Sequence, residues 1–111
     1  MVADSAMQQL ALETNAVPAS FGLGQNFPNP FNPTTQINYQ LPEPAHVSLK
    51  IYDILGRLVT TLVDDMNQAG YYSVSFDGSK LASGVYLTRF IVKPQDGTRS
   101  IVQTRKIVLM K

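Results

Sequence analysis

Apolar side chains fall at every second position in several short runs of this chain, and this alternation limits the possible folds more than any other feature. Residues 36–41 place isoleucine, tyrosine and leucine between polar residues, and residues 46–53 repeat the pattern with valine, leucine and isoleucine. A period of two puts successive side chains on opposite faces of a strand. We therefore expect half-buried β-strands. Similar runs predict further strands at residues 57–63, 72–76, 85–92 and 99–110.

Turn-forming residues separate these runs at intervals of roughly 8–14 residues, a spacing typical of a sandwich of two antiparallel sheets. The predicted fold class is therefore all-β. The run at 85–92 is largely apolar and should be an inner strand, whereas the polar residues 64–70 should form a loop. The side chains expected to face inward are Ile37, Tyr39, Val47, Leu49, Ile51, Val74 and Phe76.

A proline-rich segment at residues 26–34 precedes the first of these strands. Its three prolines fix φ, remove backbone donors and push the preceding residues toward extended geometry. We expect a stiff, extended stretch that is neither a helix nor a central strand. Phe27 and Phe31 should pin it to the domain. The alternative is a polyproline-type ligand for an aromatic groove.

The chain divides into a linker and one domain. Residues 1–24 are rich in alanine, glutamine and small polar residues, and Pro18 interrupts any regular structure there. Apolar residues near positions 7–11 have helical spacing, so this linker could carry a short helix. Residues 25–111 should form the folded domain. No stretch has the roughly 18 apolar residues that a membrane-spanning helix needs, and the N-terminus does not resemble a secretory leader.

The composition of the chain excludes most kinds of catalytic site. The 111 residues include no cysteine and a single histidine, which excludes disulfides, a thiol nucleophile and a metal site built on Cys or clustered His. His46 falls on the polar side of its run. The adjacent Asp64 and Asp65 should point in different directions and lack the ligand spacing of a calcium loop. We expect no enzyme activity, no metal and no cofactor.

Charge is distributed unevenly along the chain. The formal net charge is +1, too small for a non-specific nucleic-acid binder. Residues 1–49 contain three acidic and no basic side chains, whereas the C-terminal stretch carries Arg99, Arg105, Lys106 and Lys111. One interpretation is an edge strand kept soluble by basic side chains. The other is a contact surface for an anionic partner.

Five short motifs occur in order along the chain: QNFPNPFNPTT at 25–35, ILGRLV at 54–59, AGYY at 69–72, LASGVY at 81–86 and QTRKIVLMK at 103–111. Together they resemble the type A C-terminal sorting domain of type IX secretion cargo. The same pattern is similar to the Ig-like domain of flagellar hook-capping proteins. The resemblance covers about residues 21–111.

The resemblance implies an Ig-like antiparallel β-sandwich of about seven strands behind an extended N-terminal linker. It also implies a non-catalytic signal at the end of a larger exported polypeptide. The partners would be the upstream cargo domains, the type IX translocon in the outer membrane and a surface sortase that cuts within residues 3–24. The cargo would pass through the periplasm and end at the cell surface or in the medium.

The motifs also imply roles for particular residues. Those matching the parts associated with recognition are Gly84, Val85, Tyr86, Arg105, Lys106 and Lys111. Those matching structural positions are Pro28, Asn29, Pro30, Phe31, Asn32, Pro33, Gly56 and Gly70. A purely structural interpretation also exists, in which Gly84 makes a turn and Tyr86 fills the core.

Two other functions fit the residues. An exposed edge strand, or the extended N-terminal segment, could pair with a second copy and build a dimer or filament, and the apolar residues 107–110 at the end of the chain suggest this function. A carbohydrate-binding accessory domain would use Tyr71, Tyr72 and Tyr86. Alternation sends Tyr71 and Tyr72 to opposite faces, so at most one of that pair is exposed.

Overall fold

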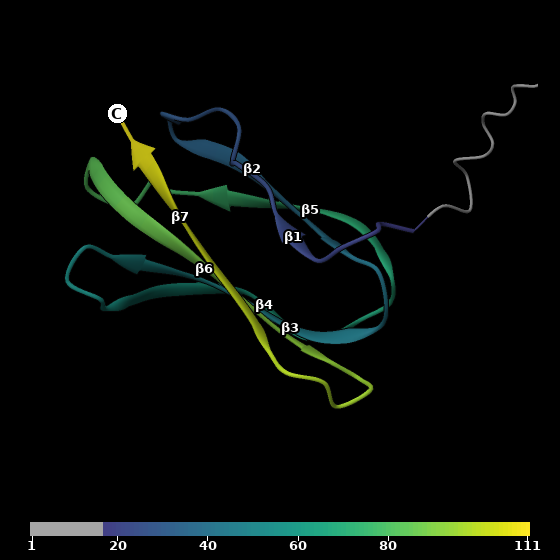
Figure 1. Cartoon of the computed structure of the whole chain (residues 1–111). Coiled ribbons are helices and arrows are strands. Elements are labelled where there is room, and N and C mark those ends of the chain that lie inside the picture. The colour runs from purple at the N-terminus through teal and green to yellow at the C-terminus, as the bar shows by residue number, and fades with distance from the viewer. Residues whose placement is uncertain (1–16) are drawn as a thin grey trace, which may run out of the picture.

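The alternating runs form two antiparallel sheets packed face to face in the computed structural model, which describes residues 17–111 (Figure 1). This architecture confirms the predicted all-β sandwich. The seven strands are β1 (Gly22–Leu23), β2 (Thr34–Leu41), β3 (Ala45–Asp53), β4 (Leu58–Asn67), β5 (Gly70–Asp77), β6 (Gly84–Pro94) and β7 (Ile101–Leu109). The described part of the chain holds no helix that could span a membrane. The helix considered near residues 7–11 lies outside the described residues.

The smaller sheet has the strand order β1-β2-β5, and the larger sheet has the order β4-β3-β6-β7. The predicted inner strand at 85–92 is confirmed, because β6 lies between β3 and β7. The C-terminal strand β7 is an edge strand, as expected. The remaining edges are β1 and β5 in the smaller sheet and β4 in the larger one.

The core lies between the sheets and follows the period of two. Six of the seven side chains predicted to face inward are buried, and Val74 is half-buried against the others. Aromatic rings link the layers: the rings of Tyr39 and Phe90 lie 5.3 Å apart, and those of Phe31 and Phe76 lie 5.8 Å apart. The rings of Tyr39 and Tyr72, which face each other on β2 and β5, are stacked 4.9 Å apart.

The predicted loop at 64–70 is wrong for its first half. Strand β4 continues to Asn67 because Asp64 and Asp65 remain paired with β3. Both carboxylates are exposed, which an edge strand tolerates. The sheet also begins earlier than residue 25, because Gly22 and Leu23 pair with Gln40 and Tyr39 as strand β1.

Phe31 is buried at 1 % exposure, but the expectation that Phe27 also pins the proline-rich segment through its ring is wrong. The Phe27 side chain is 78 % exposed. Its backbone instead exchanges two hydrogen bonds with Gln36, of 3.0 and 2.9 Å. Residues paired in this way send their side chains to the same face, and Gln36 faces solvent. The segment contains bends, and its three X-Pro bonds are cis.

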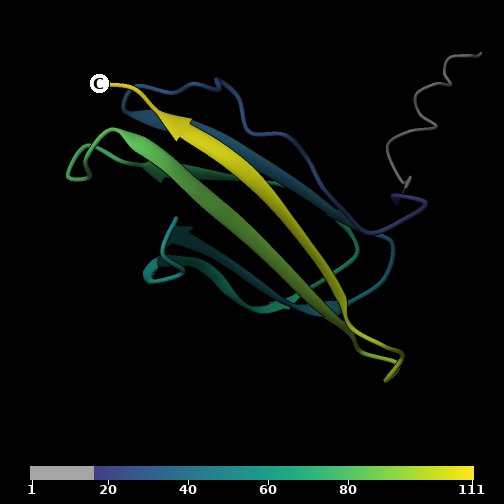
Figure 2. The ribbon, with the colours of Figure 1, turned by 60° about the vertical axis from the view of Figure 1, so that its left-hand side comes forward.

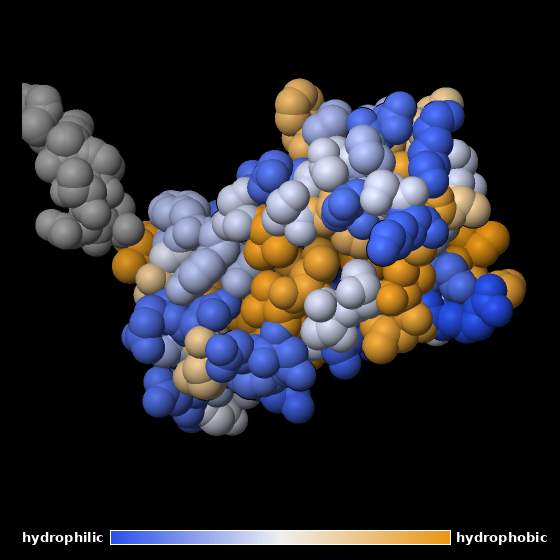
Figure 3. All heavy atoms as spheres, turned by 180° about the vertical axis from the view of Figure 1, so that it is seen from behind, coloured by the Kyte–Doolittle hydropathy of each residue, from blue (hydrophilic) through white to orange (hydrophobic). Residues whose placement is uncertain are grey.

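The two open sides of the sandwich differ. Between β1 and β7, the Leu23 amide donates to Gln103 Oε1 at 2.7 Å, and Arg105 Nε donates to the Leu23 carbonyl at 2.8 Å. Two side chains of the larger sheet thus form hydrogen bonds with the backbone of the smaller sheet. Between β4 and β5 lies an apolar cleft of about 310 Å³, lined in part by Val59, Leu62 and Leu81. Figure 3 shows the molecule from behind, opposite to the view of Figure 1, with apolar atoms exposed in the middle of the molecule.

Candidate functional site

Four of the five sequence motifs gather at one end of the sandwich. Strand β3 finishes at Asp53 opposite Tyr86 of β6, and Gly84 of β6 lies opposite Leu109 of β7. The smaller sheet contributes the start of β2 and the end of β5, which pair there. We call this end, formed by residues 28–33, 54–59, 78–86 and 108–111, the motif end. It includes the C-terminus in Figure 1.

Lys111 fastens the loop that precedes β6. Its Nζ donates to the carbonyl oxygens of Ser79 and Leu81, at 2.7 Å each. Its backbone amide donates to Ser83 Oγ at 3.0 Å. The shape of the loop at 78–83 therefore depends on the C-terminal residue of the chain, so the LASGVY motif and the C-terminal motif form one structural unit.

The three residues Gly84, Val85 and Tyr86 have different surroundings. Gly84 has a φ of 154°, in the region that favours glycine. Tyr86 is buried, and its hydroxyl donates to the Ala82 carbonyl at 2.7 Å, which holds the loop from its other side. Val85 is 37 % exposed and faces outward beside Val108. Of these side chains, only Val85 is open to a partner.

The proline-rich segment covers one half of the free edge of β7. The Phe31 amide donates to the Val108 carbonyl at 2.8 Å, and the Met110 amide donates to the Phe31 carbonyl at 3.0 Å. The Val108 amide donates to Asn29 Oδ1 at 3.0 Å. Backbone groups alternate along a strand, so those of Thr104 and Lys106 face the same way as those of Val108. The described residues provide them no backbone partner on this edge.

Sequence reasoning missed two contributors to the motif end. A Cβ added at Gly78 would lie 3.0 Å from Leu109 Cδ2 and 3.3 Å from Phe31 Cε2, so any other residue here would force these side chains to shift. The Asp-Gly pair at 77–78 marks a turn but does not reveal this contact. The second is Thr35, which is buried and joins Asn26 Nδ2, at 3.1 Å, to the Pro28 carbonyl, at 2.9 Å.

The other motif residues lie elsewhere or act locally. Arg105 closes the side between β1 and β7, as described above, and Lys106 is exposed further along β7. Gly56, with a φ of 84°, completes the turn between β3 and β4 at the motif end. Gly70 opens β5 at the opposite end, paired with Leu41. The structure thus brings four of the six recognition candidates together and leaves Arg105 and Lys106 apart.

The turn at Gly56 is held by one carboxylate. Asp53 accepts hydrogen bonds from the backbone amides of Leu55 and Arg57 at 2.9 Å each, and from Arg57 Nε at 2.8 Å. The Arg57 amide, followed by the Arg57 side chain and the Leu55 amide, lowers the pKa of Asp53 against a smaller opposing effect of desolvation. A negative charge is therefore kept at this turn.

The titratable groups do not assemble a reaction centre in the described part of the chain. His46 Nε2 lies 3.1 Å from Asp64 Oδ1 across β3 and β4, a partner that the sequence did not reveal, but both side chains are exposed. Residues 17–111 contain no group of three or more His, Cys, Asp or Glu side chains placed to hold a metal ion. Burial, reinforced by Tyr72, raises the pKa of Tyr39 to about 12.

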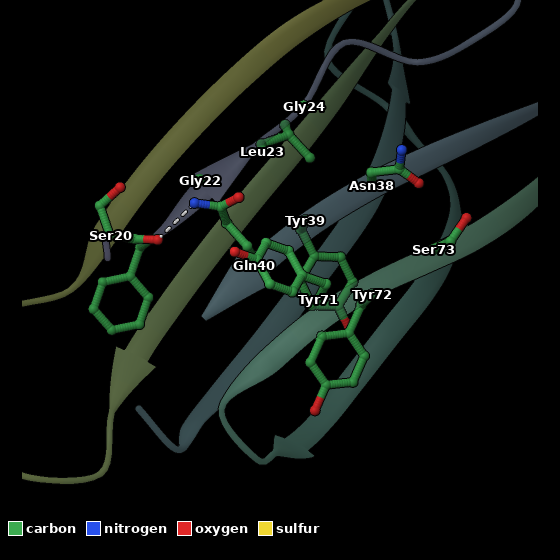
Figure 4. A pocket seen from close by; sticks show the side chains of 11 residues that line it. Ser20, Gly22, Leu23, Gly24, Asn38, Tyr39, Gln40, Tyr71, Tyr72 and Ser73 are labelled. Atoms are coloured by element: carbon green, nitrogen blue, oxygen red, sulfur yellow. Dashed lines mark hydrogen bonds between the residues drawn. The ribbon is translucent and has the colours of Figure 1, made fainter. Parts of the chain in front are cut away.

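The three tyrosines proposed for sugar binding do not form one platform. Tyr72 is stacked on Tyr39, and Tyr86 is buried at the motif end. Tyr71, which is 67 % exposed, lines an open groove of about 600 Å³ together with Tyr39 and Tyr72 (Figure 4). In this groove Gln40 Nε2 donates to the Ser20 carbonyl at 3.0 Å.

Comparison with known proteins agrees with this architecture. The crystal structure of CopC from Methylosinus trichosporium OB3b matches 80 % of this chain and 92 % of its own, with a TM-score of 0.52 and 17 % identity, which is a likeness of fold. No curated protein sequence matches the chain. The family model described as "Secretion system C-terminal sorting domain" matches residues 25–109. The chain therefore belongs to the family of C-terminal sorting domains of the type IX secretion system.

Proposed function

We propose that this domain directs an upstream cargo through the type IX translocon, and that the translocon reads the motif end as a folded surface. Membership of the family implies a larger cargo polypeptide, the type IX machinery and export to the cell surface or the medium. Domains of this family are in general non-catalytic. The finer proposal concerns which part of the surface carries the signal.

This proposal is supported by one observation: the motif end and the point where the N-terminal linker reaches the sandwich lie at opposite ends of the molecule. Strand β1 pairs with the last residues of β2, so the polypeptide reaches the sandwich at the end where β2 finishes. Figures 1 and 2 show the C-terminal end of β7 at one end of the molecule and the residues before β1 at the other. A cargo attached through residues 1–24 would leave the motif end open to a partner.

The signal is folded rather than linear, because its parts are separated by up to about 80 residues in the sequence. Phe31, Gly78 and Leu109 meet only in the tertiary structure. In this proposal a surface sortase then cuts the linker within residues 3–24. Of the described residues in that range, 17–24, residues 17–21 precede the first strand, whereas Gly22 and Leu23 form β1.

The test compares two matched insertions in a reporter fused ahead of residues 1–111. Deleting residues 103–111 would remove most of β7 and destroy the larger sheet, so it cannot separate folding from recognition. The turns at Gly56 and Gly97 both have a glycine of positive φ, 84° and 82°, with open space around it. Both are also held by an aspartate, Asp53 or Asp96. Gly56 lies at the motif end, and Gly97 lies at the opposite end.

The same short Gly/Ser insert is placed after Gly56 in one fusion and after Gly97 in the other. A longer surface loop costs little stability, about 0.6 kcal/mol per doubling of length. We expect the Gly97 insertion to be exported normally in a type IX-competent host, and the Gly56 insertion to accumulate in the periplasm while its unfolding midpoint stays comparable. Equal export of both fusions would rule out the motif end as the recognised surface.

Self-association is a second candidate, which the free edges of β4 and β5 favour. The proline-rich segment and the end of β7 bond to each other through residues 29–31, whereas the other half of the β7 edge is left without a backbone partner in the described chain. The apolar cleft beside Leu62 is the remaining open side. A sedimentation coefficient that rises with concentration, and that Leu62→Lys returns to the monomer value, would support this function.

A further inference from the structure

The outer face of the larger sheet carries four cations, Lys50, Arg89, Lys93 and Lys106, which we call the basic face. Lys50 on β3 lies directly opposite Arg89 on β6. Both point away from the core, because their neighbours Leu49 and Phe90 are fully buried. Lys106 faces the same side of β7, and Lys93 continues the row along β6.

These cations have no acidic partner within residues 17–111. The ion pairs of the described chain are His46–Asp64 and Arg57–Asp53, and neither includes a member of the basic face. The His46–Asp64 pair lies on the same outer face, where His46 is opposite Lys93. Like charges placed directly opposite each other across a strand pair destabilise a sheet. The Lys50–Arg89 pair therefore opposes folding, so its presence needs a reason other than stability.

Protection of an edge strand does not supply that reason. Basic side chains discourage pairing of edge strands, which accounts for Lys106 on β7. Lys50 and Arg89 belong to β3 and β6, the two inner strands, where no edge is exposed. A need for solubility does not explain the presence of Lys50 and Arg89 either. The outer face of the smaller sheet has amide and hydroxyl side chains, such as Gln36 and Ser75, and no lysine or arginine.

Apolar side chains lie between the cations. Tyr52, Leu87 and Ile91 are half-buried on this face, and Leu87 lies between Tyr52 and Lys106 across the strands. Leu58 is 54 % exposed at its border. Aromatic residues and arginine are enriched in protein interfaces, whereas lysine is depleted there, so Tyr52 and Arg89 are the members of this face that are typical of an interface. Because Tyr52, Leu87 and Ile91 are half-buried, this part of the face has little apolar surface to insert into a bilayer, and it suits a protein partner better.

We propose that the basic face docks on an acidic protein surface with an apolar centre, as part of the export machinery; this inference rests on the function proposed above. The strand spacing and rise per residue give the face about 20 Å by 30 Å. An area of about 600 Å² is below the roughly 800 Å² per partner of a standard stable interface and suits a transient complex. A sorting signal that must be released requires such a complex.

The test neutralises the inner pair in the reporter fusion with Lys50→Gln and Arg89→Gln. Removing the repulsion should leave the domain as stable as before or more stable, while export in a type IX-competent host becomes about tenfold slower because complementary charge speeds docking. The control is Asn38→Glu with Ser75→Glu, two positions on the other outer face that are not directly opposed and that change net charge by the same two units. Its export should be unchanged.

The outcomes separate this inference from the function on which it rests. Failure of the unaltered fusion to be exported would overturn the proposed function. Normal export of both the unaltered fusion and the Lys50→Gln/Arg89→Gln fusion would overturn the basic face alone, as would an equal defect in the control. Cosedimentation of the unaltered fusion with phosphatidylglycerol vesicles but not phosphatidylcholine vesicles, lost in the neutralised pair, would assign the face to anionic lipid instead.

Discussion

Gly78 is the residue on which the closest packing at the motif end depends. Its backbone amide donates to the Pro33 carbonyl at 2.8 Å, and the absent side chain leaves room for Leu109 and Phe31. The two motifs that contain residues 31–33 and Leu109 are distant in the sequence and meet around this one position. A glycine outside every motif thus provides the room for the proline-rich segment and the C-terminal strand to pack closely.

We predict that Gly78→Ala destabilises the domain by about 1–3 kcal/mol, the usual cost of overpacking a well-packed site. Urea unfolding measures the change. Gly22→Ala is the control, because its Cβ would lie at an ordinary 3.6 Å from Gln40. Combining Gly78→Ala with Leu109→Ala should cost less than the two changes added together, since the shorter side chain removes the closest contact. Strict additivity would contradict this explanation.

Among the strands, β7 is the one that connects the two sheets and the proline-rich segment through hydrogen bonds. One edge pairs with β6 over nine residues, and the end of the other edge receives the proline-rich segment. Its inward-facing Gln103 and Arg105 hold β1 of the opposite sheet through Leu23. The basic C-terminal stretch is therefore structural at Arg105 and Lys111, whereas Lys106 remains open to solvent.

We predict that Gln103→Ala costs about 1–2 kcal/mol of stability, because the buried Leu23 amide loses its acceptor. Hydrogen exchange followed by NMR should show faster exchange at Leu23, while the amides that join β2 and β5 keep their protection. Thr104→Ala, on the exposed outer face, should leave both properties unchanged. Undiminished protection of Leu23 in Gln103→Ala would show that β1 is held by other contacts.

The molecule as a whole is asymmetric: its two ends differ in chemistry, and so do its two outer faces. One end gathers the motifs, and the other receives the polypeptide through β1. The outer face of the smaller sheet has mainly uncharged polar side chains, with Asp77 at the end of β5, whereas the outer face of the larger sheet is basic with apolar side chains between the charges. Acidic residues are placed mainly at turns and on the edge strand β4, where they accept backbone hydrogen bonds or face solvent.

We predict that acid destabilises the domain through its turns. The pKa values of Asp53, Asp77 and Asp96 are lowered, first of all by a backbone amide within four positions further along the chain. Lowered pKa values stabilise the folded state above the unfolded value of about 4, and this stability is lost as the pH falls through the folded values. Glu43, whose pKa is raised by desolvation first and then by Asp96, acts in the opposite sense.

Urea midpoints measured between pH 7 and pH 2 test this dependence. The unaltered domain should lose stability below about pH 4, where unfolded aspartates take up protons. Asp77→Asn should be less stable at pH 7 and should show a shallower fall, because the amide cannot provide the same charge to the Ser79 backbone. An identical fall in both proteins would place the acid sensitivity elsewhere.

The sequence by itself determined the fold class, the inner strand and part of the core, whereas Phe90, Ile107 and Leu109 were not among the side chains predicted to face inward. Alternation is a local property, so Ile37, Val47 and Ile51 could be assigned to the interior without knowing what they face. The resemblance also identified the family from motifs alone. The extent of β4 was missed because its last residues are polar, and only pairing with β3 makes them a strand.

Tertiary structure alone decided which motifs meet, which cations gather and which edges remain free. Phe27 and Phe31 look equivalent in the sequence, yet the pairing with Gln36 turns one ring to solvent while the other is buried against Phe76. Lys50 and Arg89 are 39 positions apart and become opposed only through the register of β3 and β6. Such contacts depend on strand order and register, which are set by the packing of the whole sandwich rather than by any local pattern.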